Sequence, residues 1–72
     1  MSLEARTLTA NNAAELAAWC GGKAVVEYDA LDSAQSFPGI NVPVGTGLEV
    51  KRASLGDTIT RNESGVFRVV KN

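Results

Sequence analysis

The sequence predicts an α+β fold in which one short helix packs on a curved antiparallel sheet of four to five strands. Curvature of that sheet into a small, partly open barrel is kept as an alternative. One segment carries the start, spacing and stop signals of a helix, and several short segments are rich in Ile, Val, Thr and Phe. Turn residues separate these segments, and the 72 residues are expected to form a single domain, residues 1–72.

The composition argues against several classes of function. Seven basic and eight acidic residues give a formal net charge of −1, which provides no general attraction to nucleic acid or to anionic membranes. The chain has no histidine and one cysteine, Cys20, which excludes His-based catalysis, an internal disulfide and a multi-cysteine zinc site. We therefore expect a non-enzymatic protein without cofactor or metal.

Hydropathy gives an expectation about location. No apolar run approaches the roughly 20 residues of a membrane span, and no signal segment is evident. With a single cysteine, the chain is expected to work in a reducing cytoplasm and to have no membrane partner.

The first elements are a short strand and a helix. Residues 1–8 permit a strand, with residues 7–9 its best part. Asn12 is expected to cap the following helix, with Glu15 reaching back to complete a capping box. The helix should run from residue 13 to residue 20 and end at the pair of glycines that follows.

One face of this helix is predicted to pack on the sheet. The face consists of Ala13, Leu16, Ala17 and Cys20, whose helical spacing places them on the same side. Trp19 borders this face, and we expect it in the core or at its edge rather than as a ligand platform.

The residue pattern in the middle of the chain predicts three strands and one long loop. Residues 23–28 form the first strand, and residues 29–39 the loop, which Leu31 and Phe37 are expected to pin to the core. Residues 40–44 alternate, with Ile40, Val42 and Val44 on one side. Pro43 lacks an amide hydrogen, so this strand should lie at an edge or have a break in its ladder there. After a reversal at residues 45–47, residues 48–52 should form a strand with Leu48 and Val50 inward.

The C-terminal part predicts a β-hairpin of residues 58–62 and 66–70. A four-residue loop would divide the apolar side chains between the two faces. A three-residue loop pairs Asn62 with Val66, requires Gly65 in the left-handed conformation, and sets the apolar residues on one face. We choose that register, which places Ile59, Phe67 and Val69 toward the helix and Arg61 beside Phe67 as a candidate stacked pair.

Several residues invite a functional interpretation that the local pattern does not favour. Residues 21–23 lie at a helix C-terminus and lack the spacing of a phosphate loop. Glu27, Asp29 and Asp32 are expected to be solvated turn carboxylates rather than a metal site. Cys20 is expected to be packed and inert, and Asp57 to cap its turn through its own backbone amides.

The residues proposed for a partner surface are mostly basic. Lys51, Arg52, Arg61 and Arg68 form a small basic patch if their strands share a face. That patch would suit single-stranded nucleic acid with Tyr28 and Phe67 as the stacking aromatics, and the alternative is a salt-bridged, solvated face. Trp19 is the remaining candidate for such a surface.

Four segments of the chain resemble a family of small bacteriophage proteins from phages and prophages of actinobacteria. These segments are residues 12–22, 40–44, 53–61 and 65–67. The shared features are a capped helix that ends in Trp-Cys-Gly-Gly and a later Gly-Asp-x-Ile turn and strand, followed by Gly-x-Phe. Thr58 stands where the family often has an aromatic residue, and the Cys-Lys-Pro-Asp tail of many members is lacking. The resemblance implies a phage-encoded protein of the host cytoplasm, and the family supplies no established mechanism.

The function expected from the sequence is that of a small phage accessory protein that works by binding protein. Its partner would be itself, as a homo-oligomer, or a host factor, through a sheet edge or the rim around Trp19. The first alternative is a small nucleic-acid-binding protein that uses the basic residues, and the second is a minor structural component of the virion.

Overall fold

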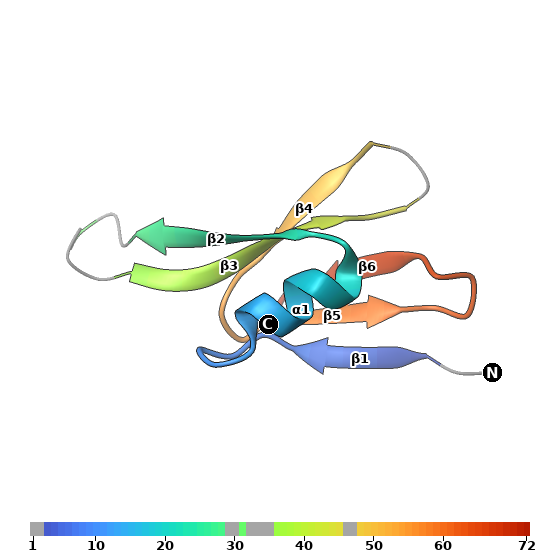
Figure 1. Cartoon of the computed structure of the whole chain (residues 1–72), viewed down its shortest axis with the longest axis horizontal. Helices are drawn as coiled ribbons and strands as arrows, with labels where there is room; N and C mark the ends of the chain where they lie inside the picture. Colours follow the sequence, from blue (N-terminus) through green and yellow to red (C-terminus); the bar gives the residue numbers. More distant parts are fainter. Residues whose placement is uncertain (1–2, 29–30, 32–35, 46–47) are drawn as a thin grey trace.

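The computed structural model describes residues 3–28, 31, 36–45 and 48–72. It is an α+β fold with one short helix, as predicted (Figure 1). The elements are β1 (Glu4–Thr7), α1 (Ala13–Cys20), β2 (Lys23–Tyr28), β3 (Ser36–Pro43), β4 (Val50–Ala53), β5 (Thr58–Arg61) and β6 (Phe67–Val70).

The strands form two antiparallel sheets instead of the single sheet of four to five strands that was predicted. The order is β1-β5-β6 in one sheet and β2-β3-β4 in the other, and the described strands do not close into a barrel. The first sheet joins the two ends of the chain, because β1 pairs with β5 from Glu4 opposite Arg61 to Thr7 opposite Thr58. Such long-range pairing leaves no local mark in the sequence, which explains why the division was missed.

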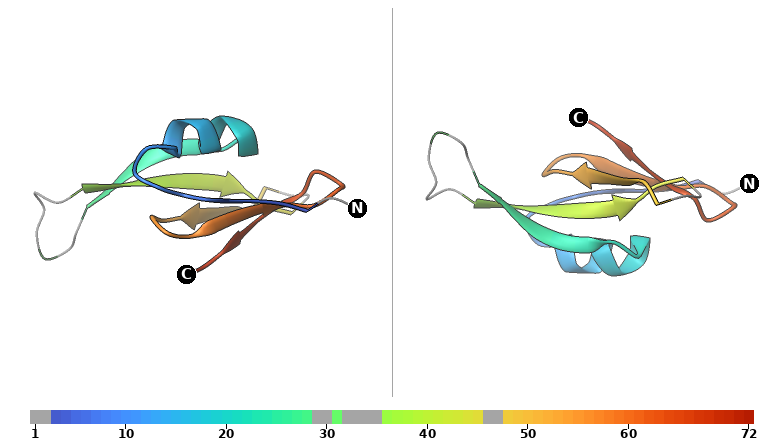
Figure 2. Two further views of the ribbon diagram at one scale, coloured as in Figure 1. Left: turned by 90° about the horizontal axis from the view of Figure 1, so that it is seen from below. Right: turned by 90° about the horizontal axis from the view of Figure 1, so that it is seen from above.

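The core lies where α1 and the two sheets meet. Among the described residues, the nine buried apolar ones come from the helix, from three strands or their flanks, and from the chain after β1. They are Leu8, Leu16, Ala17, Cys20, Ile40, Val42, Val44, Ala53 and Ile59. Figure 2 shows α1 lying along β2 and β3, the two strands that it contacts most. Burial of this small set is the main stabilising term for a chain of this length.

The helix has the predicted bounds and buried face, but its N-terminus is built differently. Asn12 makes no side-chain hydrogen bond to the first turn of α1. Its Oδ1 accepts from the Thr9 amide at 2.7 Å and its Nδ2 donates to the Thr7 carbonyl at 2.8 Å. With ψ near 9°, Asn12 lacks the extended backbone that aims a capping side chain at the helix, so it closes the turn after β1 instead.

The C-terminus of α1 follows the predicted pattern. Gly21 has φ of 68°, and the Gly22 amide donates to the Ala17 carbonyl at 2.9 Å. This arrangement satisfies carbonyls of the last turn and directs the chain into β2.

Phe37 and Leu31 do not anchor the segment between β2 and β3 to the core. Phe37 belongs to β3, which starts earlier than predicted, and it is 40% exposed. It faces the side of the sheet opposite to Ile40 and Val42, because it lies an odd number of residues from both. Leu31 is 97% exposed, so this prediction is wrong for both residues. Asp29 and Asp32 lie outside the described residues.

Of the two alternatives predicted for Pro43, an edge strand or a break in the strand ladder, the structure agrees with the break. β3 is the central strand of its sheet, so an edge position is wrong. Its pairing with β2 ends where Asn41 lies opposite Lys23, and Pro43 lies beyond that point. The missing amide hydrogen therefore costs no bond to β2.

The inward face of β4 is opposite to the predicted one. Leu48 is fully exposed and Val50 is 54% exposed. Pairing with β3 sets Ala53 opposite Ile40 and Lys51 opposite Val42, so Ala53 is the buried residue of β4. The register with β3 decides the face, and it outweighs the local preference of the larger apolar residues for burial.

The C-terminal hairpin has the predicted register. The Asn62 amide donates to the Val66 carbonyl at 3.1 Å, and Gly65 has φ of 82°. The Asn62 side chain closes the loop, since its Oδ1 accepts from the amides of Ser64 and Val66, both at 2.9 Å. Ile59 is buried, and Phe67 and Val69 pack against the core, as expected from this register.

Candidate functional site

Two of the four predicted basic residues are directed at carboxylates of their own sheet. Arg52 donates to the Asn41 side chain and lies 3.6 Å from the Glu27 carboxylate, on the outer face of the β2-β3-β4 sheet. Arg61 lies 3.2 Å from the Glu4 carboxylate of β1. These two arginines therefore belong to separate ion pairs on different sheets and do not form one basic patch.

The other two, Lys51 and Arg68, meet at a pocket between the two sheets. We call it the cation pocket; it has a volume of about 330 Å³ and is lined by Val44, Lys51, Arg68, Val69 and Lys71. Lys51 lies 3.4 Å from the exposed Glu49 carboxylate, and Lys71 lies 3.0 Å from Asp57. Among the described residues Arg68 has no ion pair. Lys71 was not predicted, because it lies after the last strand and its place is fixed by contacts with the Asp57 carboxylate and the Arg52 carbonyl.

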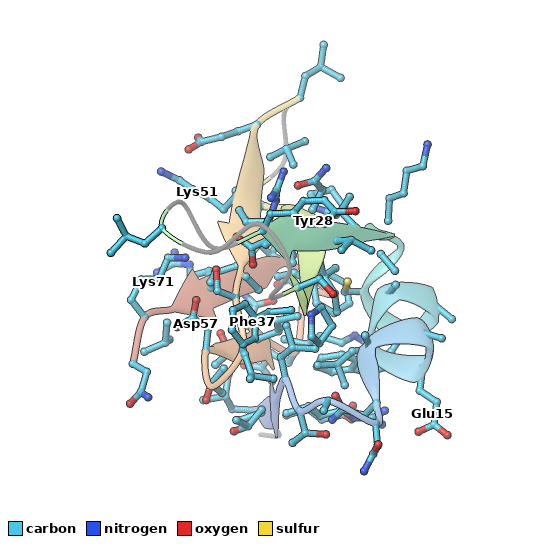
Figure 3. All side chains as sticks on the ribbon, turned by 90° about the vertical axis from the view of Figure 1, so that its left-hand side faces the viewer. Glu15, Tyr28, Phe37, Lys51, Asp57 and Lys71 are labelled. Carbon is cyan, nitrogen blue, oxygen red and sulfur yellow. The ribbon has the colours of Figure 1, made fainter. Side chains whose placement is uncertain are left out.

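Asp57 is a buried carboxylate that holds the chain end beside the cation pocket. Its Oδ2 accepts from the Ser54 amide at 2.8 Å and from the Lys71 Nζ at 3.0 Å, and its Oδ1 accepts from the Asn72 amide at 3.0 Å. The bonds from the Ser54 and Asn72 amides are the main causes that lower the pKa of Asp57 to about 2. Figure 3 shows Asp57 and Lys71 next to each other, with Lys51 on the same side of the molecule.

The prediction that Asp57 caps its turn is confirmed, but the predicted donor, its own backbone amide, is wrong. Its carboxylate accepts from the amide of Ser54 rather than from its own, while the Asp57 amide donates to the Ser54 carbonyl at 2.9 Å. The bond to Asn72 was not foreseen, since nothing local links these two residues.

Trp19 lies at the edge of the core, as predicted, and its ring is already in contact on two sides. The Phe67 ring meets it edge-on, with centroids 5.1 Å apart, and the Arg6 guanidinium lies 4.4 Å from its centroid. The cation over an aromatic ring is thus Arg6. Arg61 lies opposite Phe67 on the neighbouring strand, as expected, but its guanidinium is directed at Glu4 instead of stacking on that ring. Glu4 and Arg6 occupy alternate positions of one strand, a spacing that places them on the same face and could have been read from the sequence.

A third feature is a two-stranded ribbon at one end of the molecule. β4 pairs with β3 only from Ile40 to Pro43, so residues 25–28 of β2 and 36–39 of β3 continue without a third strand. We call these eight residues the arm; Figure 1 shows it extending to the left of the view, away from α1. Its exposed apolar side chains are Val26 (59%), Tyr28 (68%) and Phe37 (40%).

The described residues contain no group of three or more side chains that would bind a metal ion. Cys20 is buried, its thiol lies 3.7 Å from the Ala17 carbonyl, and burial is the main cause that raises its pKa. A raised pKa disfavours the thiolate, and the burial agrees with the packed cysteine that was expected, while its inertness stays a prediction. Within the described part of the chain, no helix is long and apolar enough to cross a membrane.

Comparison of the chain with protein-family models, with curated proteins and with solved structures gave no match. The resemblance to small phage proteins therefore stays a prediction that rests on the segments quoted above.

Proposed function

We propose that this chain is a non-enzymatic phage accessory protein that acts by binding protein, and that the arm binds a second copy of the chain. The observation that carries the proposal is the exposure of Val26, Tyr28 and Phe37 on a ribbon that only two strands form. A two-stranded ribbon is only marginally stable in water, and a third strand would both pair its free edge and cover apolar side chains.

The sequence of β2 suits a second copy as the partner. β2 is an edge strand, so one side of its backbone is open to pairing. Antiparallel pairing of two copies centred on Val25 would set Lys23, which lies just before the arm, opposite Glu27 of the other copy. The Glu27 carboxylate also lies 3.6 Å from Arg52 of its own chain. Opposite charges in this position contribute about 0.2–1 kcal/mol per pair and favour this register over its neighbours. Such a contact between identical edges is closed and symmetric, which limits the assembly to a dimer.

The proposal is tested by the mass of the protein in solution. At about 100 µM we expect a dimer for the wild type and a monomer for Val26→Lys, because lysine on an edge strand opposes pairing and the two added charges would lie diagonally across the contact. Leu55→Lys is the matched control, since Leu55 is 43% exposed between β4 and β5 and lies outside the arm. Circular dichroism should show that both variants stay folded.

The outcomes separate the parts of the proposal. A monomeric wild type at this concentration would end the proposal of self-assembly. A dimer that persists in Val26→Lys would keep self-assembly and remove the arm as its surface. A pull-down from host cells, with Val26→Lys and Leu55→Lys as paired baits, tests the host factor as the partner. Detection of the protein in purified particles would favour the virion component.

The nucleic-acid alternative has less support from the geometry. Arg52 and Arg61 are directed at Glu27 and Glu4, so two of the four basic residues are partly neutralised on separate sheets. This alternative predicts a gel shift at low salt that weakens steeply as salt is raised. The proposal of a protein-binding function expects no such shift with single- or double-stranded probes.

A further inference from the structure

We propose that the cation pocket is a binding site for a small amphipathic anion, a carboxylate with a short aliphatic tail. This inference is independent of the arm, because the pocket lies between β6 and the β3–β4 end of the other sheet. Its volume of about 330 Å³ is at the lower end of the range for small-molecule sites, roughly 300–1,000 Å³. A pocket of this size suits a ligand of a few carbon atoms beyond its charged group.

The charge of the lining selects an anion. Of the described residues that line the pocket, three of five are cations and none is a carboxylate. Lys51 is paired only with Glu49 on the surface, where both side chains are more than half exposed, and such pairs are weak. Lys71 keeps a fixed position, because its Nζ donates to the Arg52 carbonyl at 2.6 Å as well as to Asp57.

Arg68 is the residue that would bind the carboxylate. It projects from β6, and no carboxylate of the described part of the chain pairs with it. A guanidinium donates two parallel hydrogen bonds to a carboxylate, which fixes the orientation of the bound group. The free charge of Arg68 is therefore the specific component, because Lys51 and Lys71 are each paired with a carboxylate, Glu49 and Asp57.

The apolar part of the lining is the reason to expect an aliphatic tail on the ligand. Val44 is only 8% exposed and Val69 packs against the core, so these two valines are the rigid apolar part of the lining. An inorganic anion would leave the valines in contact with water, whereas an aliphatic tail would cover them, at about 25 cal/mol for each Å². The combination distinguishes an amphipathic anion from a simple phosphate or sulfate.

The test is a titration of the full chain, with its valine methyl groups labelled, followed by NMR. With hexanoate as the probe we expect saturable shifts of the Val44 and Val69 methyl signals with an affinity in the millimolar range. Hexylamine and 1-hexanol, which lack the negative charge, should give none. Arg68→Gln should weaken hexanoate at least about five-fold, in line with the loss of a charged hydrogen bond. Arg61→Gln, which removes an arginine outside the pocket, should leave the affinity unchanged.

Several outcomes would overturn the inference. It fails if hexanoate produces no saturable shift at either valine, or if 1-hexanol binds as well as hexanoate. Equal affinity of inorganic phosphate would remove the amphipathic ligand class. If the Arg68→Gln spectrum shows loss of folding, Lys51→Gln replaces it, with a smaller but measurable weakening expected; an unchanged affinity there would count against the inference. None of these results bears on the dimer, which is measured without ligand.

Discussion

At the scale of single residues, the Asp57 carboxylate joins parts of the chain that are distant in sequence. It accepts hydrogen bonds from the Ser54 amide, the Asn72 amide and the Lys71 ammonium. Donors fixed by the backbone stabilise the charged form, so the pKa of Asp57 falls from 3.8 to about 2 on folding. The charged carboxylate is thus part of what holds the C-terminus on the turn before β5.

We predict that Asp57→Asn lowers the free energy of unfolding by about 1–2 kcal/mol at pH 7, because the amide loses the charge and presents hydrogen atoms to donors. Since folding lowers the pKa of Asp57, its contribution is complete above the unfolded value of 3.8 and is lost as pH falls toward about 2. Urea unfolding at neutral pH and in steps down to about pH 3 measures the difference between wild type and variant.

The control for this prediction is Glu63→Gln, which removes a carboxylate exposed on the hairpin loop. Its effect should stay within about 0.5 kcal/mol at every pH. A wild-type advantage over Asp57→Asn that does not shrink in acid would show that the charge of Asp57 is not what stabilises the fold.

At the scale of elements, the two glycines after α1 have different tasks. Gly21 takes the left-handed conformation that ends the helix and has open space around it. Gly22 is needed for a close approach, because a Cβ there would overlap the backbone oxygen of Asn41 and crowd the Cys20 sulfur. This approach brings the start of β2 against β3, where Lys23 lies opposite Asn41.

We predict that Gly22→Ala lowers the free energy of unfolding by more than about 2 kcal/mol, because the added methyl must displace backbone of β3. Gly21→Ala should cost about 1 kcal/mol, since only the left-handed conformation is disfavoured there. Thermal unfolding of the two variants side by side measures the contrast. Equal losses, or a larger loss at Gly21, would contradict the close packing of β2 on β3 at this point.

At the scale of the whole molecule, the shape is elongated around a small core. The principal extents are 42 × 23 × 20 Å, while the buried apolar residues lie where α1 and the two sheets meet. The arm lies outside this core and exposes Val26 and Tyr28. A chain of this length buries a modest fraction of its surface, so covering the arm would add noticeably to its stability.

This predicts a melting temperature that depends on protein concentration. A dimer binds only between folded copies, so raising the concentration from about 10 µM to about 500 µM should raise the wild-type Tm by several degrees. Val26→Lys should melt at the same temperature at both concentrations, and Leu55→Lys should behave as the wild type does. Differential scanning calorimetry gives all three values, and a wild-type Tm that ignores concentration would argue against the dimer.

Local patterns along the chain are sufficient to predict most of its individual elements. The helix, the β2 strand and the C-terminal hairpin with its register have the predicted bounds or nearly so. In each case residues close in sequence supply the signal: helix formers before a glycine pair, β-branched residues in alternation, and Asn62 with Gly65 in a tight loop.

The way these elements combine, and the places of the charged side chains, depend on contacts between distant parts of the chain. The division into two sheets, the inward face of β4 and the bonds of Asp57 to the chain end all join residues far apart in sequence. Arg68 and Lys71 line one pocket with Lys51, while Arg52 and Arg61 are directed elsewhere, although all five are basic residues. The physical reason is that strand pairing fixes the face and neighbours of every side chain, and pairing over long separations depends on the whole core rather than on any local pattern.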